Sequence, residues 1–230
     1  MNILGFVKTS LVDYPGNIVS TMFLGGCNFK CPFCHNPELA GNKGMKLDKE
    51  KIFSYLKKRK GLIDGVCVSG GEPTLYLELP KLLKEIKDLG LLVKVDTNGS
   101  NPEMVKKIID EKLVDYIAMD IKSSFENYDK ASGVDVDLNN IQESINILKN
   151  SEIDYEFRTT MVPSFVKMED FESVCKSLEG ANKFFIQQFD PKNNLINNQL
   201  KKERLYPPSD MEDFLTLAKP YFKVCGLRNL

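Results

Sequence analysis

Residues 91–110, LLVKVDTNGSNPEMVKKIID, contain the unit that decides the fold. The run 91–96 is rich in strand-forming residues, and the polar turn DTNG follows it at 96–99. Asn101-Pro102 then has the sequence of a helix N-cap and first helical residue, and Val105, Ile108 and Ile109 recur with the helical period. The stretch therefore predicts one strand, a polar turn and one helix.

The same strand–helix alternation extends along the chain in both directions. Strand-like runs are predicted at 18–24, 65–68, 91–96, 116–121, 155–161 and 184–189, with helical periods after each. No Pro/Gly-rich linker separates these units, so we expect one domain over 1–230 with a short lead-in at 1–17. Right-handed crossovers allow a doubly wound open sheet or a barrel, and six units are too few for a closed eight-stranded barrel. We therefore expect an α/β fold, an open six-stranded (βα)6 partial TIM barrel with a parallel sheet. In such a fold the active site lies at the carboxyl ends of the strands.

Composition excludes several classes of protein. Of the 230 residues, 42% are hydrophobic and 27% are charged, as in ordinary globular proteins. Thirty-one Lys and Arg against 32 Asp and Glu give a net charge of −1, so no basic field for nucleic acid is expected. No apolar run approaches the roughly 20 residues that cross a bilayer, and no signal peptide is recognised at the start. We therefore expect a cytoplasmic protein without nucleic-acid or membrane partners.

Three of the six cysteines stand close together. Cys27, Cys31 and Cys34 form a C-x3-C-x2-C pattern directly after the first predicted strand. Structural zinc takes four protein ligands, and His35 is a poor fourth ligand because it adjoins Cys34. The alternative is an iron–sulfur cluster held by three thiolates, with one iron left open for a substrate. The spacing favours the cluster over zinc without excluding either.

Charged and glycine residues follow the other predicted strands. Ser69-Gly70-Gly71-Glu72-Pro73-Thr74 either lets a ligand approach the backbone or is an ordinary tight turn. Burying unpaired charges costs several kcal/mol each, so a purely structural role does not account for the whole set. A zwitterionic amino acid with a ribose would require such carboxylates and cations. The set comprises Glu72, Asp96, Asp120, Lys122 and Arg158.

These motifs together resemble a known superfamily. Residues 27–34 match the C-x3-C-x-aromatic-C signature of radical S-adenosylmethionine (SAM) enzymes, with Phe33 as the aromatic residue. GGEP at 70–73 matches that superfamily's second motif. CHN at 34–36, DTNG at 96–99 and MDIK at 119–122 resemble the glycyl-radical-enzyme activating enzymes. The opening GFVKTSLVDYPG at 5–16 is similar to the activating proteins of anaerobic ribonucleoside-triphosphate reductase.

The resemblance implies a role for each matching residue. Cys27, Cys31 and Cys34 would ligate a 4Fe–4S cluster whose open iron is chelated by the amino and carboxylate groups of SAM. Gly71 and Glu72 would bind the methionine amino group, Asp96 the ribose or a nearby cation, and Lys122 with Arg158 the carboxylate. The implied SAM-binding residues are Phe33, Gly70, Gly71, Glu72, Asp96, Asp120, Lys122 and Arg158. A monovalent cation is also implied, at Asp96, Thr97, Met119 and Asp120.

The resemblance further implies the activity and the partners. An electron from reduced flavodoxin or ferredoxin would lead to cleavage of SAM to methionine and a 5′-deoxyadenosyl radical, which takes hydrogen from a glycine of a glycyl radical enzyme. The opening motif points to anaerobic (class III) ribonucleotide reductase as that partner. One alternative is the same chemistry on another glycyl radical enzyme, a peptide or a small molecule. The other is a non-catalytic metal or electron-transfer protein.

Predictions for the single histidine and the three remaining cysteines rest on the type of residue and its neighbours in the sequence. His35 is the only histidine, and we hypothesise that it forms a hydrogen bond near the cluster and tunes its potential. Cys67, Cys175 and Cys225 are expected to be small buried hydrophobic residues.

Overall fold

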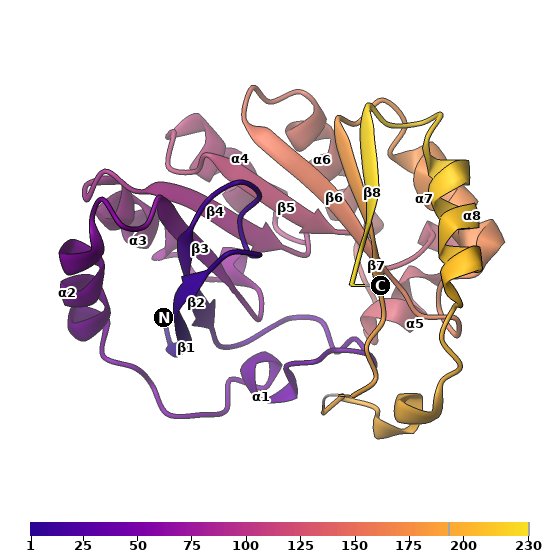
Figure 1. The fold of residues 1–230 in the computed structure, drawn as a ribbon, viewed down its shortest axis with the longest axis horizontal. Helices are drawn as coiled ribbons and strands as arrows, with labels where there is room; N and C mark the ends of the chain where they lie inside the picture. The colour runs from indigo at the N-terminus through magenta and orange to yellow at the C-terminus, as the bar shows by residue number, and fades with distance from the viewer. Residues whose placement is uncertain (193, 230) are drawn as a thin grey trace.

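A single curved sheet runs through the computed structural model, which describes residues 1–192 and 194–229. In that part of the chain the sheet has eight strands, which lie side by side in chain order. They are β1 (Ile3–Ser10), β2 (Val19–Leu24), β3 (Gly65–Gly70), β4 (Leu92–Thr97), β5 (Tyr116–Asp120), β6 (Asp154–Met161), β7 (Lys183–Gln188) and β8 (Val224–Arg228). Figure 1 shows them fanning from β1 and β2 on one side to β7 and β8 on the other.

The strand pairing aligns the polar strand ends. β1 is antiparallel to β2, and every later pair of neighbours is parallel. The register sets Thr97 beside Met119 and Asp120 beside Arg158. Parallel strands end at the same edge of a sheet, so these residues meet at the edge where ligands bind in open α/β folds.

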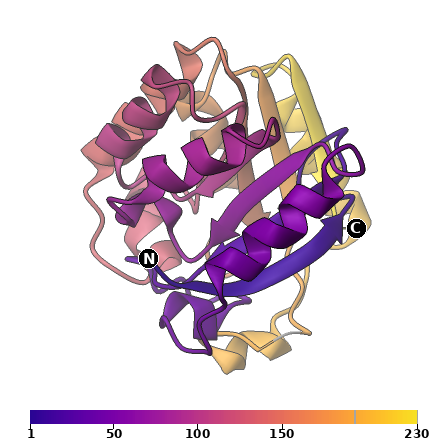
Figure 2. The ribbon, with the colours of Figure 1, turned by 90° about the vertical axis from the view of Figure 1, so that its left-hand side faces the viewer.

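The connecting helices cover the outer face of this sheet (Figures 1 and 2). They are α2 (Lys49–Arg59), α3 (Leu79–Lys87), α4 (Pro102–Asp110), α6 (Leu138–Lys149), α7 (Met168–Ser177) and α8 (Pro208–Ala218). Shorter helices lie in loops after the strands: α1 (Pro37–Ala40), α5 (Tyr128–Ser132), and the 3-10 helices η1 (Pro73–Leu75), η2 (Phe125–Asn127) and η3 (Asn198–Lys202). In the described chain no helix is both long and apolar enough to cross a membrane.

The two faces of the sheet differ in chemistry. Alternate residues such as Val66, Val68 and Val95 face the helices and are fully buried in the main core. A small apolar cluster of Tyr14, Val19, Cys67, Tyr116 and Ala118 lies apart from that core. Cys67 alternates with Val66 and Val68 along β3, which places this cluster on the inner face. A cavity beside this cluster is lined by the charged residues Lys94, Glu156 and Arg158.

An internal ion pair ties the last strand to the middle of the sheet. Arg228 on β8 donates from both terminal nitrogens to the two carboxylate oxygens of Glu156 on β6, at 2.7 and 2.8 Å. Tyr116 on β5 donates its hydroxyl to the same carboxylate at 2.7 Å. The guanidinium also lies 3.7 Å from the centre of the Phe185 ring. Glu156 is fully buried, so this pairing is required to offset the cost of burying its charge.

The predicted open, mostly parallel α/β fold is confirmed, and all six predicted strands are present as β2 to β7. The predicted cap is also present, since Asn101 Oδ1 accepts from Met104 N at 3.1 Å. Six strands is an underestimate, because two edge strands were not predicted. β1 lies within the lead-in 1–17, and β8 is short, contains Gly226 and has no buried residue. Edge strands carry a weak apolar alternation because they are only partly covered.

Candidate active site

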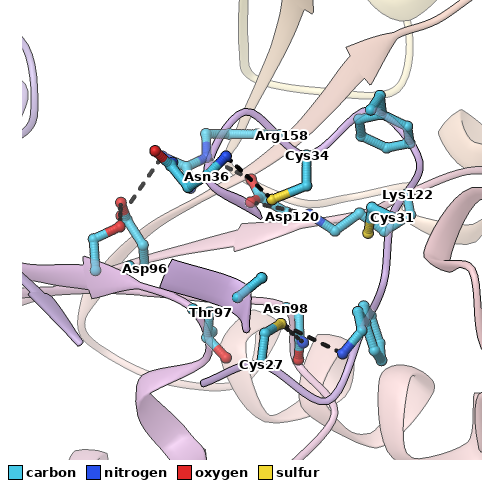
Figure 3. Close-up of a pocket in the computed structure, with 16 residues that line it drawn as sticks. Cys27, Cys31, Cys34, Asn36, Asp96, Thr97, Asn98, Asp120, Lys122 and Arg158 are labelled. Atoms are coloured by element: carbon cyan, nitrogen blue, oxygen red, sulfur yellow. Dashed lines mark hydrogen bonds and ion pairs between the residues drawn. The ribbon is translucent and has the colours of Figure 1, made fainter. Parts of the chain in front are cut away.

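Three cysteines on the loop after β2 open into one cavity at the carboxyl edge of the sheet (Figure 3). The cavity has a volume of about 210 Å³. Besides Cys27, Cys31 and Cys34 it is lined by Phe29, Phe33, Asn36, Ala40, Ser69, Gly70, Gly71, Asp96, Thr97, Asn98, Asp120, Lys122 and Arg158. Residues from five successive segments of the chain, far apart in sequence, therefore share one space.

Backbone hydrogen bonds hold the cysteine loop in place. Cys27 N donates to the carbonyl of Ala40 at 3.1 Å, and Lys30 N donates to the carbonyl of Ser132 at 2.8 Å. Cys34 N donates to the carbonyl of Cys31 at 2.9 Å. The loop is thus attached both to α1 and to α5, which limits how far the thiols can move apart.

The thiols have the surroundings of metal ligands. Phe29 N donates to Cys27 Sγ, and Asn36 N donates to Cys34 Sγ, each at 3.4 Å. Such donors stabilise the negative charge of a ligating sulfur. Burial raises the pKa of the Cys27 thiol to about 12 and also raises the pKa of Cys31. Buried thiols of this kind are ionised only when a metal centre supplies positive charge.

The donor set fits an iron–sulfur cluster better than a single zinc ion. Within the described residues, no three His, Cys, Asp or Glu side chains are grouped to hold one metal ion. A cluster binds each thiolate at a different iron, so its ligands lie farther apart than those of one ion. Three thiols around one cavity that carboxylates and cations also line match that requirement.

Gly70 and Gly71 are needed for close packing of two backbones as well as for lining the cavity. A Cβ on Gly71 would collide with the carbonyl oxygen of Gly26, next to Cys27. A Cβ on Gly70 would collide with the backbone of Leu24, and Gly70 has a φ of 119°, which favours glycine. The glycines therefore let β3 press against the start of the cysteine loop.

Glu72 has a different position from the one expected. It is fully buried and is not among the described residues that line the cavity. Its Oε1 accepts from Thr74 N at 3.0 Å, from Thr74 Oγ1 at 2.5 Å and from Thr97 Oγ1 at 2.7 Å. Its Oε2 accepts from Asn98 N at 2.6 Å. Burial raises the pKa of Glu72, and these donors act in the opposite direction. The carboxylate holds the end of β3 against the end of β4.

Asp120, Lys122 and Arg158 form a charged wall of the same cavity, on and just after β5 and on β6. Arg158 Nε donates to Asp120 Oδ1 at 2.8 Å, and Lys122 Nζ donates to Asp120 Oδ2 at 3.3 Å. Burial opposes ionisation of Asp120, but the charges of Arg158 and Lys122 outweigh it and hold its pKa below the ordinary range. Lys122 has the longer contact with Asp120, so its ammonium is the more available of the two cations for an anionic ligand.

Asp96 is already surrounded by donors. Lys94 Nζ forms an ion pair with Asp96 Oδ1, Ser69 Oγ donates to Oδ2 at 2.9 Å, and Arg158 Nη1 lies 3.5 Å from Oδ1. Burial opposes ionisation of Asp96, but Arg158 and Lys94 lower its pKa. In the described chain, the carboxylates of Asp96 and Asp120 thus face three cations. The site does not fit an additional monovalent cation, because that ion would displace or be repelled by the charges present.

His35 lies away from the cysteine cavity. Its ring stacks on Phe189 with centroids 5.8 Å apart, and it lines a separate cavity with Gln188 and Asp190. Its Nε2 is buried and has no hydrogen-bond partner in the part of the chain that is described. The hypothesised hydrogen bond near a cluster therefore has no supporting contact.

Several site residues were not predicted. Ser69, Asn98 and Asn36 line the cavity, and each belongs to a motif that was recognised without a role for that residue. Lys94 was missed as well. Its signal is a lysine two positions before Asp96 in a strand, which places both side chains on one face. Cys67 and Cys175 are buried, as expected, whereas Cys225 is only partly buried.

Comparisons with known proteins agree with this geometry. A family model described as the Radical SAM superfamily matches residues 21–178. A Methanocaldococcus jannaschii protein provisionally named glycyl-radical enzyme activating enzyme is 33% identical over 234 residues, covering 98% of this chain and 95% of that protein. A pyruvate formate-lyase-activating enzyme of Clostridium pasteurianum is 37% identical over 120 residues, covering 49% of this chain and 48% of its own.

Solved structures share the fold at low sequence identity. Streptococcus suis SuiB has a TM-score of 0.67 at 14% identity, covering 92% of this chain and 49% of that chain. Methylornithine synthase has a TM-score of 0.58 at 15% identity, covering 90% of this chain and 64% of its own. The chain thus corresponds to one part of these larger proteins.

Proposed function

Because the chain belongs to the radical SAM superfamily and, within it, to the glycyl-radical-enzyme activating enzymes, we propose that it removes a hydrogen atom from a glycine of a separate partner enzyme. The family uses a 4Fe–4S cluster and SAM. When bound, these would supply one-electron cleavage of SAM to methionine and a 5′-deoxyadenosyl radical, and the hydrogen atom taken from the glycine would leave a glycyl radical and give 5′-deoxyadenosine. The protein itself binds, orients and shields the reacting groups.

One observation carries this proposal: three thiols, two cavity-lining glycines and two cations share a single cavity of about 210 Å³. Cys27, Cys31 and Cys34 would hold the cluster from the loop side. Lys122 and Arg158 would face the carboxylate of SAM from the charged wall. A non-catalytic metal protein has no need for that second wall, since burying its charges costs free energy without a ligand to use them.

The remaining residues would position the SAM molecule between these walls. Gly71 exposes its backbone to the cavity and can approach the methionine amino group, whereas Glu72 would act indirectly by holding the strand ends. Asp96 would meet the ribose, and Asp120 would hold the two cations at the correct spacing. Phe33 lines the cavity and packs on Phe165, with ring centroids 5.7 Å apart, which helps to exclude water. We do not extend the proposal to a monovalent cation.

For the partner we propose anaerobic ribonucleotide reductase, with reduced flavodoxin or ferredoxin as the electron donor. The opening segment 5–16 supports this choice, and its first half, residues 5–10, belongs to β1, the first edge strand of the sheet. Pyruvate formate-lyase is the alternative partner, because relatives with that activity in their names align with about half of this chain.

The test is an anaerobic assay of 5′-deoxyadenosine with the reconstituted, reduced protein and SAM. It is run alone, with an anaerobic ribonucleotide reductase and with a pyruvate formate-lyase, each from the source organism of the chain. We expect product to rise with the reductase, together with a glycyl radical signal on it in electron paramagnetic resonance. A radical on pyruvate formate-lyase alone would move the assignment to that partner.

Cys31→Ala is the matched control, because it removes one cluster ligand and leaves the cation wall intact. It should contain less iron and form no product. Product that is unaffected by any glycyl radical enzyme would indicate a peptide or small-molecule substrate. An intact cluster that yields no product would favour the electron-transfer alternative.

A further inference from the structure

The Lys94 ammonium places a buried positive charge beside the Asp96 carboxylate. Lys94 is 1% exposed, and its Nζ pairs with Asp96 Oδ1. Both residues lie on β4 two positions apart, so the pleat puts them on the same face. The lysine stem is buried along the inner face of the sheet, beside Cys67, whose sulfur lies 3.8 Å from Nζ.

Asp96 is the carboxylate that pairs with this ammonium, although two other carboxylates line the same inner cavity. Glu156 is paired with Arg228 at 2.7 and 2.8 Å, and Asp13 accepts from Thr21 Oγ1 at 2.5 Å. Arg158 repels the ammonium. A buried ammonium without a counter-charge costs several kcal/mol. Breaking the pair with Asp96 would therefore carry a cost in free energy.

A cation that is attached to the chain competes for Asp96 more strongly than a dissolved cation. Its effective concentration at the site is fixed by the chain and does not depend on the salt in solution. A potassium or sodium ion would have to displace Lys94, leaving that ammonium buried and unpaired.

We propose that Lys94 is a positioning residue that replaces a monovalent cation at Asp96, so that SAM binding by this protein is independent of alkali ions. The inference rests on the proposed function, since it concerns the same SAM site. Lys94 acts through Asp96, which lines the cysteine cavity, while Lys94 itself lines only the inner one.

The first test measures SAM binding to the reconstituted wild-type protein at equal ionic strength in choline, sodium and potassium chloride. Equilibrium dialysis gives the dissociation constant, and the spectrum of the reduced cluster with SAM gives a second readout. We expect the dissociation constants to agree within about twofold. A loss of about tenfold in choline would overturn the inference without any mutagenesis.

The second test uses Lys94→Met, which keeps the apolar stem and removes the charge. Its SAM affinity should fall by about tenfold in choline and recover in potassium or sodium, because a free cation can then reach Asp96. Lys94→Arg keeps a charge and should remain independent of alkali ions. A Lys94→Met protein that binds SAM equally well in all three salts would contradict the proposal.

Lys122→Met is the matched control, because it also removes one ammonium, but from Asp120. It should weaken SAM binding in every salt without rescue by potassium. Rescue of this variant would show that alkali ions do not act at the position of Lys94. Wild-type protein that binds no SAM in any salt would instead contradict the proposed function, which keeps the two failures separate.

Discussion

Replacing Glu72 with glutamine should destabilise the protein by about 3 kcal/mol, because a buried carboxylate that accepts four hydrogen bonds would become an amide that can accept fewer. Glutamine can keep its oxygen at the position of Oε1, where three donors converge. Its NH2 group then faces Asn98 N, which donates to Oε2 at 2.6 Å in the native protein.

The expected loss of about 3 kcal/mol follows from the contact with Asn98 N alone. A hydrogen bond to a charged acceptor contributes about 1.5 to 3 kcal/mol, and a buried donor left without a partner costs about 1 to 3 kcal/mol. The three bonds that remain also lose the charge that strengthens them. For a chain of this size, 3 kcal/mol corresponds to a fall of about 6 to 12 °C in the melting temperature.

The assay is thermal unfolding of the cluster-free protein, followed by circular dichroism under anaerobic conditions. SAM binding of the reconstituted variant is measured in parallel. Glu111→Gln is the control, because Glu111 is exposed and should change stability by no more than about 0.5 kcal/mol. An unchanged melting temperature with lost SAM binding would refute the structural role and make Glu72 a direct ligand of SAM.

Three further predictions concern the same edge of the sheet. Gly71→Ala should lower stability by about 1 to 3 kcal/mol and reduce the iron content after reconstitution, since its Cβ collides with the cysteine loop; iron analysis that matches wild type would contradict this. Arg228→Met should lower the free energy of unfolding in urea by about 3 to 5 kcal/mol, because it leaves the buried Glu156 unpaired. A loss below 1 kcal/mol, about the contribution of an exposed ion pair, would argue against this role. The pKa of Asp120 is lower in the folded protein than in the unfolded chain. The free energy of unfolding that its ion pairs contribute is therefore fully present above about pH 4, and it is lost as the pH falls through the pKa of the folded state. Arg158→Met should be less stable at pH 7 and show a flatter profile below pH 4, so equal acid profiles for the two proteins would be inconsistent with this ion pair.

Patterns within the local sequence predicted the fold class and the six inner strands. The alternation of strand-forming runs and helical periods predicted the parallel strands β2 to β7, since each pattern reflects burial of one face of its own segment. The edge strands β1 and β8 were not predicted, because they are only partly buried and their alternation of apolar and polar residues is weak. Cys27, Cys31 and Cys34 were identifiable because their spacing within eight residues is itself a local feature.

What the sequence by itself determined is therefore the fold class, the cysteine loop and the set of charged residues at the strand ends. Only the tertiary structure decided how those charges pair. Glu72 accepts from Asn98 at the end of β4, and Arg158 on β6 pairs with Asp120 on β5, because both outcomes depend on the register between neighbouring strands. Hydrogen bonds and ion pairs act over a few ångströms between residues distant in sequence, so no pattern within one segment contains them.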